Sequence, residues 1–176
     1  MALRSGEILV LKEDLATPMA FVKIDPKSGE ERRIAYTGII SSRPMLDNHE
    51  RIYWTEYRRS ALFAQKVSSK ICYLDPDKRS AKQLDTKGNA LYVTPTDKNN
   101  IAWVEYASSG KYSVVSYENG KEISRHNIPL DKEVHGMAWD NATEALYLII
   151  TDNDGMYIAK LEQGKIATRI AELESM

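Results

Sequence analysis

Three histidines are the side chains best suited to acid–base chemistry or metal binding in this 176-residue sequence. We expect His49 in a turn, His126 near the end of an outer strand and His135 at the start of an inner strand. A zinc site needs several such ligands at close spacing, or carboxylates that converge on the same point. Since neither pattern is present, we predict no metal site.

The motifs of the common hydrolases and nucleotide-binding proteins are absent. The sequence contains no Gly-x-Ser-x-Gly elbow, no His-Glu-x-x-His pair and no phosphate-binding glycine loop. The segment 152–155 ends in Asp-Gly but does not fit a calcium loop, because the first ligand position would fall on Ile150. Glu56 and Glu105 could form the carboxylate pair of a glycosidase, but they occupy equivalent places in an internal repeat. We therefore expect no cofactor and no catalytic residue in this chain.

Composition excludes several partners. Lys plus Arg number 24 and Asp plus Glu number 25, so no basic field exists that would attract nucleic acid. The longest apolar run, Leu146–Ile150, is far too short to span a membrane. The first residues lack the basic and apolar segments of a signal peptide, and the single cysteine, Cys72, excludes an internal disulfide.

An internal repeat organises the chain. The heptapeptides 51–57 and 100–106 share Ile, Trp, Glu and Tyr at a constant spacing of 49 residues, and segments 7–12 and 145–151 have similar apolar character. Each is rich in β-branched and aromatic residues and is bounded by turn residues, which indicates a strand. Each is followed by a second strand, a turn with Gly, Asp or Pro, and a more polar third strand that suits a sheet edge.

Four antiparallel strands repeated every 45 to 49 residues are typical of β-propeller blades. We predict an all-β fold, a partial β-propeller of about four blades with four-stranded antiparallel meanders, in which the first blade lacks its innermost strand. The chain is expected to form one propeller segment over residues 1–176, with blades at 7–37, 41–85, 90–128 and 134–173. Helical repeat arrays do not fit, because no long segment keeps a 3.6-residue apolar period. An immunoglobulin-like sandwich is the alternative, but it would not predict the copied tryptophan strand.

The segment Thr94–Trp103 resembles the Ser-Pro-Asp-Gly turn and apolar strand of WD-like propeller repeats of the TolB and peptidase-propeller type. Thr replaces Ser in this turn, and its Gly is absent. The segment Ile52–Arg58 is also similar to envelope-protein propellers of gut Bacteroidetes. These resemblances imply a bacterial envelope or secreted protein in the periplasm or outside the cell, and they imply that any peptidase chemistry would belong to a separate domain.

We therefore predict a non-catalytic binding or scaffolding module that contacts protein or carbohydrate. The expected contact residues lie on a long loop and on an inner strand: Arg58, Phe63, His135 and Trp139. The alternative is part of a propeller hydrolase or lyase with its site in the central channel. Convergence of His135, Asp140, Glu56 and Glu105 would favour the enzyme, and their dispersal would favour the binding module.

An open arc of blades would expose apolar sheet faces at both ends, and such faces normally become interfaces. The sequence therefore also predicts a homodimer formed through the open propeller ends, unless the chain is a piece of a larger propeller.

Overall fold

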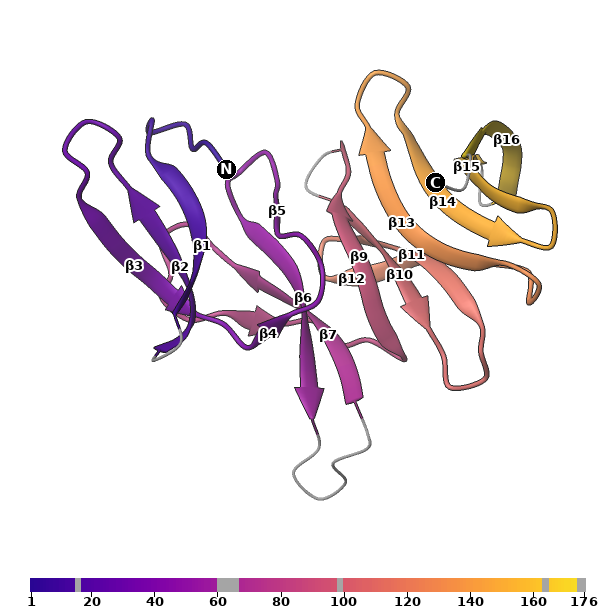
Figure 1. The fold of residues 1–176 in the computed structure, drawn as a ribbon, viewed down its shortest axis with the longest axis horizontal. Coiled ribbons are helices and arrows are strands. Elements are labelled where there is room, and N and C mark those ends of the chain that lie inside the picture. The colour runs from indigo at the N-terminus through magenta and orange to yellow at the C-terminus, as the bar shows by residue number, and fades with distance from the viewer. Residues whose placement is uncertain (15–16, 60–66, 98–99, 163–164, 174–176) are drawn as a thin grey trace. The chain divides into compact units, whose positions relative to one another are not determined.

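The computed structural model describes residues 1–14, 17–59, 67–97, 100–162 and 165–173, which form sixteen β-strands and no α-helix. The chain divides into two compact units, unit 1 (Met1–Asp85) and unit 2 (Thr86–Met176). Each unit contains two antiparallel sheets (Figure 1). Within the described ranges, a search for helices that are long and apolar enough to cross a membrane found none.

Unit 1 begins with a three-stranded sheet, and its second sheet has four strands along its main path plus one short strand. The first sheet runs in the order β1 (Ile8–Asp14), β2 (Thr17–Ile24) and β3 (Glu31–Tyr36). The second contains β4 (Ile39–Ile40), β5 (Met45–Leu46), β6 (Ile52–Arg59), β7 (Val67–Leu74) and β8 (Lys82–Gln83). The innermost position of the first sheet holds an isolated bridge between Ala2 and Ile8.

A hydrophobic core lies between these two sheets. Phe21 and Trp54 are fully buried and meet edge to face, with ring centroids 5.0 Å apart. Such aromatic pairs add about 0.5–1.5 kcal/mol beyond the burial of their area. The other buried members come from both sheets: Leu3, Leu9, Ala35, Ile52, Cys72 and Leu74. Cys72 is thus a small core residue.

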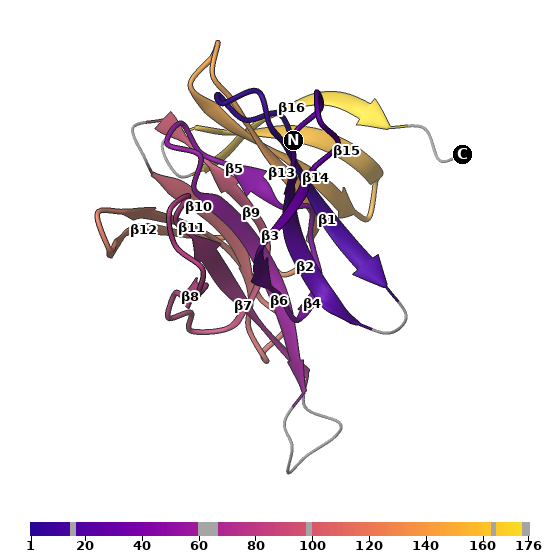
Figure 2. The ribbon, with the colours of Figure 1, turned by 90° about the vertical axis from the view of Figure 1, so that its left-hand side faces the viewer.

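Unit 2 contains two four-stranded meanders, each in sequence order from the inner to the outer strand (Figures 1 and 2). The first is β9 (Asn89–Pro95), β10 (Ile101–Tyr106), β11 (Tyr112–Glu118) and β12 (Lys121–Asn127). The second is β13 (Glu133–Asp140), β14 (Ala145–Asp152), β15 (Gly155–Glu162) and β16 (Lys165–Leu173). β10 is buried on both faces, which accounts for its nearly continuous apolar sequence, whereas the edge strand β12 is polar.

The two sheets of unit 2 also enclose a core. Its fully buried members include Val104 and Val114 from one sheet and Leu148 and Ile150 from the other. β9 packs beside β13, so the innermost strands of the two sheets are neighbours. Each unit therefore has its own apolar core between two face-to-face sheets.

Three complete four-stranded blades and one three-stranded blade would contain fifteen strands. The described residues form one strand more than this expectation. The innermost strand of the second sheet is divided into β4 and β5, which both pair with β6. Residues 41–44 between them belong to neither strand. Pro44 accounts for part of this break, because proline has no backbone N–H to donate to a ladder. The predicted blade boundaries stay a prediction.

Candidate functional site

The innermost strand β9 of unit 2 contains a β-bulge. Its pairing with β10 shifts between Ala102 and Val104. Tyr92 lies at this point with φ of 50°, a left-handed conformation that few non-glycine residues adopt. Bulges turn a side chain away from the regular alternation and are frequent beside active sites.

The neighbouring inner strand β13 has a bulge of its own. Its pairing with β14 shifts between Val134 and Gly136, which leaves His135 as the extra residue. Val134 is buried in the core, while the His135 side chain is 41% exposed. His135 is thus exposed next to the one buried residue of β13, Val134.

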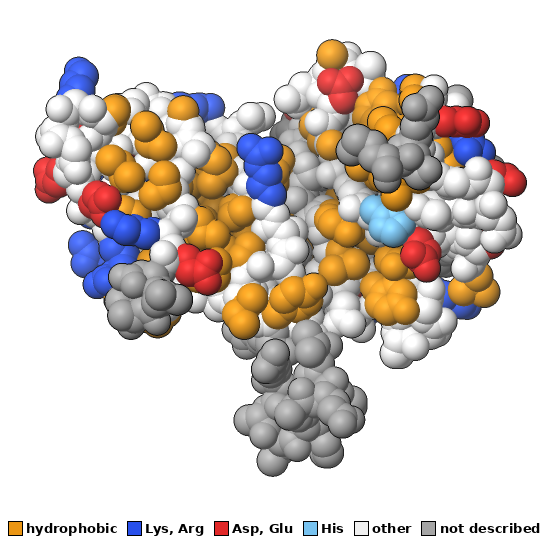
Figure 3. Space-filling model, viewed as in Figure 1, with side chains coloured by type: hydrophobic (Ala, Val, Ile, Leu, Met, Phe, Trp, Pro, Cys, Tyr) orange, Lys and Arg blue, Asp and Glu red, His pale blue; other side chains and the backbone are white. Residues whose placement is uncertain are grey.

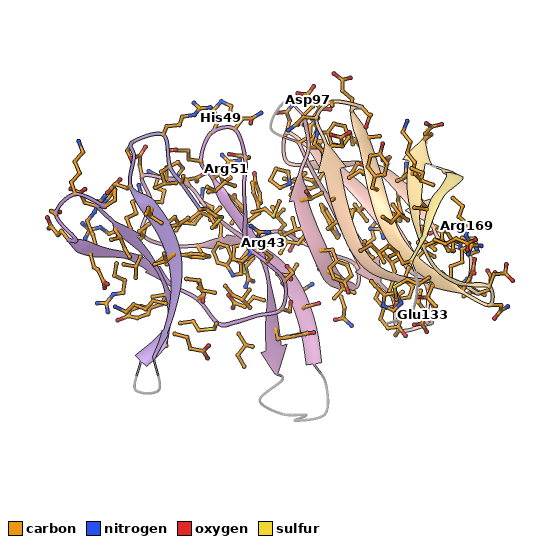
Figure 4. The ribbon with its side chains drawn as sticks, turned by 45° about the horizontal axis from the view of Figure 1, so that its top comes forward. Arg43, His49, Arg51, Asp97, Glu133 and Arg169 are labelled. Atoms are coloured by element: carbon orange, nitrogen blue, oxygen red, sulfur yellow. The ribbon has the colours of Figure 1, made fainter. Side chains whose placement is uncertain are left out.

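Unit 1 shows a comparable interruption in its inner strand. Between β4 and β5, the hydroxyls of Ser41 and Ser42 lie 2.8 and 2.6 Å from the hydroxyl of Thr55. The backbone N–H of Ser41 also donates to the Thr55 carbonyl oxygen at 2.9 Å. Arg43 follows Ser42 in the sequence. Figure 4 shows Arg43 away from the end of the unit that carries His49 and Arg51.

Glu133 is the acidic neighbour of His135. Its Oε2 lies 3.9 Å from His135 Nε2, and both side chains are accessible to solvent. Figure 4 shows Glu133 at the end of the unit 2 sheets opposite to Asp97. Figure 3 shows a histidine next to an acidic side chain, with hydrophobic side chains on both sides of them. The geometry supplies a proton acceptor with a carboxylate beside it.

Three tyrosines lie at the same end of the sheets as Glu133. The rings of Tyr106 and Tyr112 are 4.8 Å apart. Burial raises the pKa of the Tyr112 hydroxyl, and the nearby Glu133 carboxylate adds to the rise. Tyr106 and Tyr92 also raise the pKa of the Tyr112 hydroxyl. Glu133, Tyr106 and Tyr92 therefore all lie close enough to Tyr112 to interact with it electrostatically. Glu133 and His135 therefore border a phenol-rich surface.

A set of polar contacts anchors the segment that precedes Glu133. The Lys132 ammonium donates to Asp152 Oδ2 at 2.6 Å and to the Tyr157 hydroxyl at 3.0 Å. The hydrogen bond from Lys132 lowers the pKa of Asp152 to about 2. Arg169 stacks over the Tyr157 ring, with its Cζ 4.3 Å from the centroid. These contacts connect the residue before β13 to β14 and β15.

The repeated carboxylates Glu56 and Glu105 have structural partners. In each sheet the indole N–H of the tryptophan two residues earlier donates to the glutamate Oε2, at 3.2 Å from Trp54 and 3.3 Å from Trp103. Glu105 is 3% exposed and also accepts from Arg125 Nη1 at 2.8 Å. Each glutamate is thus held by the tryptophan of its own strand, which is a structural role.

The structure describes the side chains of two of the four predicted contact residues, His135 and Trp139. Arg58 belongs to β6, where its backbone pairs with Ser68, and nothing is described of its side chain. Phe63 and the rest of its loop lie outside the described residues. Trp139 lies on β13 but packs against the core, and its indole N–H donates to Asn141 Oδ1 at 2.9 Å. Of these two, His135 lies beside another titratable side chain, Glu133.

Within unit 2, His135 and Asp140 do not converge. Asp140 lies at the far end of β13 from His135, and its carboxylate accepts hydrogen bonds from the Thr143 hydroxyl and from backbone N–H groups in a turn. The carboxylate beside His135 is instead Glu133, which the sequence reasoning missed. Gly136 is the residue that could have indicated the bulge in the sequence, since a glycine inside a strand pattern often indicates one. Among the described residues, no three His, Cys, Asp or Glu side chains come together as metal ligands.

Comparison with solved structures gives the fold class. The chain is similar to a gluconolactonase from Xanthomonas campestris, with a TM-score of 0.58 and 10% identity over 93% of this chain and 57% of the other. It is also similar to a candidate 6-phosphogluconolactonase from Bacteroides fragilis, with a TM-score of 0.52 and 12% identity over 89% of this chain and 48% of the other. The chain thus spans about half the length of these proteins. No protein-family model matches the chain, and no curated protein matches it in sequence.

These matches and the observed sheets agree with a propeller-like all-β fold, a partial β-propeller of about four blades, as the sequence predicts. The prediction of a non-catalytic binding or scaffolding module is wrong, because the solved structures that share this fold bear the names of lactonases.

Proposed function

We propose that this chain is part of a β-propeller hydrolase that opens the ring of a sugar lactone, with His135 as the general base. The observation that carries the proposal is the bulge in β13, which exposes His135 next to Glu133 on an innermost strand. The lactonase names of two proteins with the same fold support the choice of reaction.

The two side chains have complementary roles in this reaction. The imidazole of His135 takes a proton from a water molecule while the water oxygen attacks the lactone carbonyl carbon. The imidazolium then gives a proton to the ring oxygen as the carbon–oxygen bond breaks, and the product is an open-chain hydroxy acid. Glu133 orients the imidazole and stabilises its charged form, because its carboxylate lies 3.9 Å from Nε2. A positioned general base accelerates such steps by about 10²–10⁴-fold.

The tyrosines beside this pair suit a sugar-derived substrate. Aromatic rings provide a flat apolar face for the C–H groups of a sugar ring, and phenolic hydroxyls provide polar contacts at the edge. Tyr106 and Tyr112 together offer both. The strained backbone of Tyr92 lies on the adjacent strand, as is common for residues near a reacting group.

The test is hydrolysis of glucono-1,5-lactone by the purified 176-residue chain, followed as acid release in a pH-stat against the spontaneous rate in buffer. We expect His135→Asn to lower kcat/KM by about 100-fold or more. His126→Asn is the matched control, since His126 lies on the edge strand β12 of the same unit, and it should leave the rate within about twofold. Glu133→Gln should lower the rate and shift its pH profile, because the imidazolium loses its neighbouring charge.

Two results would overturn the proposal. The first is a rate no higher than that of buffer, and the second is equal activity of the His135→Asn and His126→Asn variants. A change in rate without a change in the pH profile for Glu133→Gln would restrict Glu133 to a structural role.

Two further expectations accompany this proposal. We propose that the repeat is of the WD-like type found in TolB and the peptidase propellers, on the resemblance of Thr94–Trp103 to its turn signature. We also propose a periplasmic or extracellular location, which fractionation of cells that express the intact gene would test.

A further inference from the structure

A polar cleft lies at one end of unit 1. It is formed by the turn before β1, the end of β2 and the beginning of β3, and its volume is about 530 Å³. In Figure 1 these three segments lie at the upper end of the first sheet. Cavities of about 300–1,000 Å³ are typical of small-molecule sites.

Two cations lie side by side on the floor of this cleft. Lys23 of β2 and Arg32 of β3 are directly paired across the ladder, so their side chains share one face of the sheet. Like charges in this position destabilise a sheet unless an anion lies between them. The side chain of Lys23 is only 15% exposed, which increases the cost of its charge.

Glu7 neutralises this pair only in part. Its Oε2 lies 3.8 Å from Lys23 Nζ, and its Oε1 lies 3.6 Å from Arg32 Nη2. Both distances exceed the hydrogen-bonding range. One carboxylate therefore forms ion pairs with two cations but hydrogen-bonds to neither of them. The hydroxyl of Ser5 donates to Glu7 Oε2 at 2.9 Å and holds the carboxylate in place.

Two further acidic side chains line the cleft, and one of them, Asp25, is held within the turn by hydrogen bonds. Asp25 accepts from the backbone N–H of Lys27 at 2.8 Å and from the Ser28 hydroxyl at 3.1 Å. This turn fixes the backbone of Lys27, which lines the cleft together with the exposed Glu30. The cleft therefore combines cations that retain free donors with carboxylates that can accept hydroxyl groups.

From this arrangement we propose that the cleft of unit 1 binds an anionic, polyhydroxylated small molecule, a sugar acid or a sugar phosphate. The anionic group of the ligand lies between Arg32 and Lys27, where it supplies the charge that Glu7 does not. Glu7 and Glu30 accept hydrogen bonds from the ligand hydroxyls. Arg32 is suited to this role, since its planar fork of donors matches a carboxylate or phosphate and its side chain is 66% exposed. The proposal does not depend on the hydrolase activity.

The experiment is a titration of the ¹⁵N-labelled 176-residue chain with sodium gluconate, glucose 6-phosphate and neutral glucose, followed by amide chemical shifts. We expect saturable shifts at Ser5, Gly6 and Lys27 with one or both anions, and an affinity for glucose at least about tenfold weaker. The preferred anion distinguishes a carboxylate site from a phosphate site. Arg32→Gln should weaken binding by about tenfold or more, as expected for the loss of a charge-assisted contact.

Arg33→Gln is the matched control. Arg33 is the next residue on β3 and points to the opposite face, where its Cζ lies 4.5 Å from the Tyr36 ring centroid. This variant should bind with unchanged affinity. The proposal fails if no anion shifts these amides, if glucose binds as well as the anions do, or if the two arginine variants lose affinity equally. Circular dichroism of both variants separates loss of the site from loss of the fold.

Discussion

Arg125→Met is the substitution whose effect on stability can be worked out most directly. Arg125 Nη1 donates to Glu105 Oε1 at 2.8 Å, and the Glu105 side chain is 4% exposed. Methionine fills a similar volume without charge, so the variant leaves a buried carboxylate without its cation. Only two donors would remain on Glu105, the Trp103 indole N–H at 3.3 Å and the Lys87 backbone N–H at 3.2 Å.

Removing one partner of a buried ion pair costs about 3–5 kcal/mol, because the remaining charge is desolvated without compensation. The Arg125 side chain is 23% exposed, so water reaches part of the pair and the lower value applies. We therefore expect the free energy of unfolding to fall by about 3 kcal/mol at pH 7. For a chain of this length such a loss lowers the melting temperature by about 6–12 °C.

The assay is urea unfolding followed by circular dichroism at pH 7. Arg169→Met is the control, because it removes an arginine from the outer strand of the other sheet of unit 2, where the guanidinium stacks on Tyr157 and has no buried carboxylate beside it. Its cost should stay below about 1 kcal/mol. A loss below 1 kcal/mol for Arg125→Met would refute the reasoning.

Two further substitutions test local geometry. Lys132→Met should raise the pKa of Asp152 from about 2 towards its usual value near 4, measured by carboxyl ¹³C titration. In the native chain, the stability due to the lowered pKa is present above pH 4 and is lost as the pH falls towards 2. An unchanged titration of Asp152 in the variant would contradict this assignment. Gly88→Ala should lower the melting temperature, because its new Cβ would lie 2.7 Å from the Tyr106 carbonyl oxygen, whereas Gly136→Ala meets a flexible side-chain end at 3.3 Å and should be tolerated better. Equal melting temperatures for these two glycine variants would contradict this comparison.

The sequence was sufficient to predict the strands and their order. The copied segment with Ile, Trp, Glu and Tyr and the turn residues after each second strand are local patterns, and antiparallel meanders depend mainly on such neighbouring signals. The same pattern indicated that Glu56 and Glu105 share a structural origin, and both accept from the tryptophan two residues earlier. Local signals did not locate the break at residues 41–44, where Pro44 and the hydroxyl contacts with Thr55 interrupt an inner strand.

The site and the function depended on tertiary structure. A bulge is a mismatch between two paired strands, so the outward turn of His135 towards Glu133 follows from the register of β13 against β14, and residue types alone do not specify that register. Trp139 lies on the same strand as His135 but packs into the core, which the alternation expected for a regular strand would not have shown. The pairing of Lys23 with Arg32, close to Glu7, likewise arises from two strands and the turn before β1, which meet at one end of a sheet. Sequence periodicity determined which segments form strands, and the register between strands decided which side chains share a surface.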